Sequence, residues 1–111
     1  MFDEILKQIE RVKNEEVRSN PSRIADALVW FSSMYASMTE QLVDLELGYN
    51  RELVAQLQAD ISVAKAEAIA KTSTAYRDYL KGKQLEKALI EVIRSLKYWI
   101  RVKEDEYSET N

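Results

Sequence analysis

Residues 24–49 read IADALVWFSSMYASMTEQLVDLELGY, and large apolar side chains recur in this segment at alternating spacings of four and three. The repeat consists of Ile24, Leu28, Phe31, Tyr35, Met38, Leu42, Leu45 and Tyr49. These spacings place side chains along one side of an α-helix, and their persistence over several heptads is typical of coiled coils and helical bundles. The segment therefore predicts a long helix with one apolar seam.

The long helix is expected to extend in both directions from this segment. Asn20 can cap its start, and Pro21 suits a first helical position because its missing N–H would have no intrahelical partner there. The same apolar face continues through Leu53, Leu57, Ile61, Ala64 and Ala68. Gly48 offers an alternative break, but the apolar spacing passes through it unchanged. We therefore expect one continuous helix over about 21–71.

Two further helices are predicted on either side. Residues 2–18 have apolar side chains at helical spacing, and residues 74–107 repeat the spacings of four and three. Residues 72–74 are Thr-Ser-Thr, a sequence that caps helices and favours a tight break. A short connection makes consecutive helices antiparallel neighbours. The expected fold is all-α: a single domain over 1–111, built as a long coiled-coil-like hairpin behind a short N-terminal helix.

The apolar seam is longer than the short N-terminal helix could cover, so the sequence also predicts a homo-oligomer. We expect this assembly to bury seam residues of both long helices, namely Leu28, Tyr35, Leu42, Leu89, Leu96 and Trp99. Only the acidic tail, residues 104–111, has the composition of a frayed end.

Composition excludes several classes of chemistry. The chain has no cysteine and no histidine, which removes thiolate nucleophiles, Ser–His pairs and ordinary zinc sites. Glu40 and Asp44 share a helix face, but two carboxylates without a third ligand make a poor cation site. We therefore predict no catalytic residues, no metal and no cofactor. The short apolar runs predict a soluble protein with no membrane partner, and the absence of cysteine fits a reducing cytoplasm.

Charge is distributed unevenly along a chain whose net charge is −3. Residues 73–103 contain eight cations and three anions. Within them, a basic row falls on one lattice of helical spacings and consists of Lys83, Lys87, Arg94, Lys97 and Arg101. This row faces away from the seam, and Tyr98 lies beside it. A row of cations next to an aromatic ring is a pattern that binds single-stranded nucleic acid through phosphates and base stacking.

A solvated helix face is the alternative interpretation of the basic row. Glu91 stands four residues after Lys87 and three before Arg94, where it can pair with either. Charged rows on helices are commonly exposed surface without a ligand. A second alternative is that the acidic long helix or the acidic tail neutralises the row.

The segments NPSRIADAL (20–28), YRDYL (76–80) and IRSLKYWIRV (93–102) resemble small all-helical proteins that tailed phages encode near their recombination and replication genes. The layout is also similar to the helical recombination mediator of T-even phages, which forms rings and helps load a recombinase onto single-stranded DNA. This resemblance implies an oligomer whose basic row contacts DNA and whose partner is a recombinase or another replication protein.

Two classes of function follow from the sequence. In the first, the protein is an oligomeric accessory factor of phage DNA recombination or replication that binds single-stranded DNA. In the second, it is an oligomeric scaffold or adaptor that binds another protein and has no nucleic-acid role. The local positive charge of residues 73–103 favours the first class.

Overall fold

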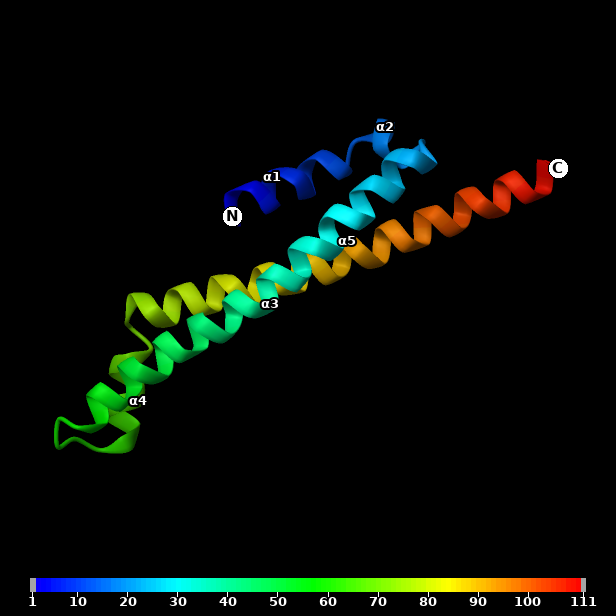
Figure 1. Ribbon diagram of the computed structural model, residues 1–111. Coiled ribbons are helices and arrows are strands. Elements are labelled where there is room, and N and C mark those ends of the chain that lie inside the picture. The colour runs from blue at the N-terminus through cyan, green and yellow to red at the C-terminus, as the bar shows by residue number, and fades with distance from the viewer. Residues whose placement is uncertain (1, 111) are drawn as a thin grey trace. The chain divides into compact units, whose positions relative to one another are not determined.

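The computed structural model describes the backbone of residues 2–110 and the side chains of residues 2–108. Within this range all regular structure is helical, which confirms the all-α prediction. The helices, labelled in Figure 1, are α1 (Phe2–Val12), α2 (Glu15–Arg18), α3 (Pro21–Leu57), α4 (Val63–Ala70) and α5 (Thr74–Thr110). The chain forms two compact units, a first unit of residues 1–36 and 87–111 and a second unit of residues 37–86.

Side-chain caps fix the starts of the two long helices. The Oδ1 atom of Asn20 accepts hydrogen bonds from the backbone N–H groups of Ser22 and Arg23, at 3.0 and 3.4 Å. The Ser73 hydroxyl accepts from the Tyr76 N–H at 3.1 Å and donates to the Ala70 carbonyl at 2.6 Å. Both bonds of Ser73 satisfy backbone groups that a helix end leaves unpaired. The predicted starts of α3 and α5 are therefore confirmed.

The first predicted helix, residues 2–18, is divided in the structure. α1 ends at Val12, and the Oδ1 atom of Asn14 accepts from the Glu16 N–H at 3.0 Å. This bond caps α2, a single turn that ends at Arg18. The continuous helix expected from the apolar spacing is interrupted because the Asn14 side chain competes with the backbone ladder.

The second predicted helix is continuous through Gly48, as expected, but it ends at Leu57 rather than near Lys71. Asp60 adopts a left-handed conformation with φ of 53°, and the Ser62 hydroxyl accepts from the Lys65 N–H to cap α4. A left-handed residue followed by a cap ends one helix and starts another.

This break also changes which face of the chain is buried. Ala66 and Ala70 are fully buried in α4, whereas Ala64 and Ala68 are exposed. The prediction that the apolar seam continues through Ala64 and Ala68 is therefore wrong, because the loop before α4 rotates the helix face.

α5 begins at Thr74 as predicted and continues through Thr110. The expectation of a frayed tail over 104–111 is wrong for residues 104–110, which are helical, and Asn111 lies outside the described residues. Lys103, Glu104 and Glu106 are good helix formers, so the acidic end can continue the helix.

In the first unit, α1 lies along the start of α3, and the end of α5 lies along the same part of α3 (Figure 1). Its apolar core contains Ile5, Val12, Ile24, Phe31, Leu89 and Leu96, each at most 6% exposed. The Trp30 ring packs edge-on against Phe31, with centroids 5.0 Å apart, and so widens this core. The core therefore combines the short N-terminal helix with the predicted seam.

In the second unit, α3 and α5 pack closely at Gly82. A Cβ atom built on Gly82 would lie 2.9 Å from methyl carbons of Leu42 and Leu45, so these side chains pack directly on the glycine. Farther along α3, the Tyr49 ring contacts Tyr76 and Tyr79, with centroids 4.9 and 6.1 Å away. Leu42 and Leu45 on α3 contact Gly82 on α5, whereas Tyr49, later on α3, contacts Tyr76 and Tyr79, which are earlier on α5. The two helices therefore run in opposite directions, which confirms the antiparallel hairpin.

The predicted seam residues pack within a single chain. Leu89 and Leu96 are fully buried, and Leu28, Tyr35, Leu42 and Trp99 are half-buried. Burial of Leu89 and Leu96 is complete without a second copy. Assembly through these residues stays a prediction.

The two glycines provide a matched test of the contact between α3 and α5, since both lie inside helices. Gly48→Ala is expected to raise the free energy of unfolding by up to about 1 kcal/mol, because alanine favours helix and the added Cβ meets open space. Gly82→Ala has the same gain in propensity but displaces Leu42 and Leu45, so we expect it to be about 1–3 kcal/mol less stable than Gly48→Ala.

Chemical denaturation of both variants beside the unmodified chain measures this difference. Equal stabilisation by the two substitutions would show that Gly82 is not a close-contact position.

Candidate nucleic-acid interface

Four cations of the predicted basic row lie on α5 in the first unit. Lys87, Arg94, Lys97 and Arg101 are all exposed, and the Tyr98 side chain beside them is 64% exposed. α5 is unbroken over this range, so their spacing keeps them on one side of the helix. We refer to these four cations and Tyr98 as the basic face.

The fifth predicted cation, Lys83, belongs to the second unit. Its Nζ atom lies 5.4 Å from the centroid of the Tyr79 ring, within the range of a cation–π interaction. Lys83 is exposed, as predicted, and its contact with Tyr79 is internal to the second unit. The structure therefore brings four of the five cations together with Tyr98 in the first unit.

One ion pair occupies part of the basic face. The Nη1 atom of Arg94 lies 3.2 Å from Oε1 of Glu91, and both side chains are more than 70% exposed. Exposed pairs of this kind contribute about 0–1 kcal/mol, so a phosphate could replace Glu91 at small cost. The alternative of a solvated helix face therefore applies most directly to Arg94.

A depression between α2 and α5 borders the basic face at Tyr98. Its volume is about 640 Å³, and its lining includes Lys13, Glu15, Arg18, Tyr98, Trp99 and Lys103. The guanidinium carbon of Arg18 lies 4.6 Å from the centroid of the Trp99 ring, which places a cation over an aromatic surface. We refer to this site as the aromatic depression, since it combines two aromatic side chains with three cations.

Sequence reasoning did not include Lys13 or Arg18 in the candidate site. Both residues precede α3, some eighty positions away from Tyr98, and share no helical spacing with it. Packing of α2 beside α5 brings them to the site, and no local pattern in the sequence encodes that packing. Lys13 directly precedes Asn14, the residue that caps α2. A charged residue beside a capping residue does not by itself identify a binding site.

A second depression lies on the other side of the basic face, between α3 and α5. Its volume is about 390 Å³, and it is lined by Ser32, Tyr35, Ile90, Ile93, Arg94 and Lys97. Two cations therefore stand next to an apolar surface that includes Tyr35. Such a surface can contact the apolar part of a ligand whose charged part reaches Arg94 and Lys97.

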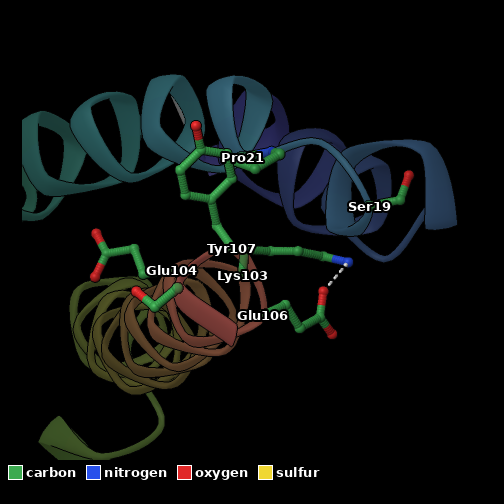
Figure 2. Close-up of a pocket in the computed structure, with 7 residues that line it drawn as sticks. Ser19, Pro21, Lys103, Glu104, Glu106 and Tyr107 are labelled. Atoms are coloured by element: carbon green, nitrogen blue, oxygen red, sulfur yellow. Dashed lines mark hydrogen bonds and ion pairs between the residues drawn. The ribbon is translucent and has the colours of Figure 1, made fainter. Parts of the chain in front are cut away.

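Acidic residues bound the positive surface towards the end of α5. Figure 2 shows Lys103 and Tyr107 extending from α5 towards the segment with Ser19 and Pro21, in a third depression of about 670 Å³. Glu104 and Glu106 also line it, and Glu106 forms an ion pair with Lys103 at 3.2 Å. Because like charges repel, we do not expect phosphates to enter this depression.

The arrangement can bind anions and flat rings. In the part of the chain that the structure describes, no three acidic side chains gather where they could hold a metal ion. Glu40 and Asp44 are both exposed on α3. The basic face and the aromatic depression together present cations beside aromatic rings, which is the chemistry of a binding surface.

Comparison of the chain with family models, curated proteins and solved structures found no match. Across residues 2–110, none of the helices combines the length and the apolar character needed to cross a membrane. Function must therefore be inferred from the surface itself.

Proposed function

We propose that this chain is a helical accessory protein of DNA recombination or replication that binds single-stranded DNA through the basic face. The observation that supports the proposal best is the position of Tyr98. This ring is 64% exposed and stands between a row of four cations and the aromatic depression with Trp99. A large exposed aromatic ring flanked by cations is suited to stacking on a base whose phosphates contact those cations.

Single strands fit this surface better than duplex DNA. Bases in a duplex have their flat faces covered by neighbouring bases, whereas a single strand can present them to Tyr98. Phosphate contacts from Lys and Arg do not depend on sequence, so we expect little preference among bases. The proposed ligand is therefore a single strand of any sequence.

The resemblance of this chain to small phage proteins suggests its setting. Such proteins are encoded near recombination and replication genes, and a mediator bound to single-stranded DNA would meet a recombinase there. We propose that the chain acts in the cytoplasm of the host cell, as an oligomer with a recombinase or another replication protein as its partner.

Titration of labelled oligothymidine with the full chain in low salt tests the proposal. If the four cations of the basic face each contact one phosphate, the logarithm of affinity should fall with the logarithm of salt concentration at a slope of about −3. Participation of Lys13 and Arg18 would steepen the slope to about −4. Fluorescence anisotropy at several salt concentrations measures it.

Two outcomes of this titration would contradict the proposal. Equal affinity for duplex and single-stranded DNA would show that bases do not stack on the surface. Absence of binding in low salt would favour the scaffold function, in which a protein with acidic side chains occupies the basic face.

Tyr98→Ala is expected to weaken single-strand binding by about 1–3 kcal/mol, the usual contribution of one stacked base. Because Tyr98 is exposed, the helix content and the unfolding free energy should change little. Tyr98→Phe is the matched control, since it keeps the ring and removes only the hydroxyl. Retention of full affinity by Tyr98→Ala would mean that the ring does not stack on DNA.

A further inference from the structure

α3 exposes a second apolar stripe within the second unit. Its side chains are between 40% and 58% exposed, and they are Val43, Leu47, Val54 and Leu57. The positions follow helical spacings of four and three if Asn50, which is also exposed, fills the gap between Leu47 and Val54. Scattered exposed apolar residues are common, but a two-heptad lattice of them is the pattern of a coiled-coil seam.

This stripe is separate from the seam inside the hairpin. Met38, Leu42 and Leu45 point towards Gly82 of α5, as their closeness to a Cβ at that position shows. At 100° per residue, the stripe lies about 130° around α3 from those side chains. Contacts within the second unit therefore cover one face of α3, and the stripe on another face stays exposed to solvent.

We propose that the stripe is the seam of a parallel, in-register coiled coil between two copies of this chain. Asn50 is the first reason for choosing a second copy. Asn50 lies three residues after Leu47 and four before Val54, which is the d position of the heptad. In an in-register parallel dimer the two d-position asparagines lie opposite each other and can hydrogen-bond across the seam.

Charge complementarity is the second reason for a second copy. Glu46 precedes the seam position Leu47, Arg51 follows the seam position Asn50, and both side chains are exposed. These are flanking positions five residues apart, which face each other between the chains of a parallel coiled coil. Glu46 of each copy would therefore lie beside Arg51 of the other, and the arrangement is satisfied twice in a symmetric dimer.

The length of the stripe sets the expected strength. From Val43 to Leu57 the stripe spans about 21 Å at helical rise. Glu40 occupies the preceding seam position, where it would face Glu40 of the second copy, and repulsion between the two carboxylates would end the seam. Such a seam is smaller than the roughly 800 Å² per partner of tight complexes. We therefore expect a reversible dimer with a dissociation constant between about 10 µM and 1 mM.

A disulfide trap tests the register directly, because the chain has no cysteine of its own. Asn50→Cys places one thiol at the proposed centre of the seam, where two copies would bring them within bonding distance. Ala55→Cys is the matched control, exposed on the same helix but about 140° around it. Mild oxidation of the full chain should convert Asn50→Cys to a covalent dimer at least tenfold faster than Ala55→Cys.

Charge exchange tests the orientation. Glu46→Lys and Arg51→Glu should each weaken self-association, because each puts like charges at the flanking positions. An equimolar mixture of these two variants should recover association, since the mixed dimer restores two opposite-charge pairs. Sedimentation equilibrium measures all three samples.

Val54→Lys should abolish the dimer, whereas Val63→Lys, at an exposed valine outside the stripe, should not. Equal cross-linking at positions 50 and 55, or a monomer at about 1 mM, would overturn the proposal. The inference does not depend on nucleic-acid binding, because none of these substitutions touches the basic face. DNA titration can therefore contradict the binding proposal without affecting the dimer proposal, and sedimentation can contradict the dimer proposal without affecting the binding proposal.

Discussion

A Leu96→Asp variant is expected to lose at least about 3 kcal/mol of unfolding free energy and to be largely unfolded in a marginally stable chain. Leu96 is 0% exposed in the core of the first unit. The substitution removes the apolar contacts of a leucine and buries a carboxylate that has no basic partner in that core. Circular dichroism in increasing denaturant measures the loss.

Leu6→Asp is the matched control, because it makes the same change at a leucine of the first unit that is 52% exposed. Its carboxylate remains in water, so we expect a loss below about 1 kcal/mol. Similar losses in the two variants would show that Leu96 does not belong to the core.

Reversal of three cations is expected to have the largest effect on DNA binding. Changing Lys87, Lys97 and Arg101 to Glu should reduce affinity for single-stranded DNA at least about 100-fold in low salt, because three proposed phosphate contacts become repulsive. All three side chains are exposed, so folding should be preserved. Arg94 is left unchanged because its replacement would also break the ion pair with Glu91.

A control triple variant has Lys7, Lys65 and Arg77 changed to Glu. These side chains are exposed, lie outside the basic face and give the same change in net charge. We expect this control to lose much less affinity than the basic-face variant. An equal loss would mean that the overall charge of the chain, and not the basic face, determines binding.

The hairpin was predictable because its signal is repeated many times. Ile24 and Phe31 on α3, and Leu89 and Leu96 on α5, are buried at positions seven apart, as the heptad pattern requires. Capping residues and apolar spacing also predicted the starts of both long helices, at Pro21 and Thr74. Many side chains support the same long helices and the same buried face, so the loss of any one of them would not change the prediction.

The end of α3 was not predictable in the same way. It depends on one left-handed residue, Asp60, and one capping hydroxyl, Ser62, with neither glycine nor proline to mark the break. The apolar spacing continues into Ala64 and Ala68, so it favoured a helix where the backbone turns. Two local groups here outweigh a weak periodic signal.

The candidate site was predictable only in its local part. Exposure of Lys87 and Tyr98 follows from their angle to the seam on one helix. The addition of Arg18 over Trp99 requires α2 to pack beside α5, which is a tertiary contact between distant segments. Helical spacing describes neighbours on one helix and does not specify such contacts.

The position of the tryptophans gives the molecule a useful optical property. The chain has two tryptophans, Trp30 and Trp99, and both belong to the first unit, whereas Tyr49, Tyr76 and Tyr79 cluster in the second. Tryptophan emission therefore reports on the first unit alone, while far-ultraviolet dichroism reports on helices of both. Denaturation curves from the two signals, recorded on the unmodified chain without any label, will coincide if the units melt together and separate if they melt in turn.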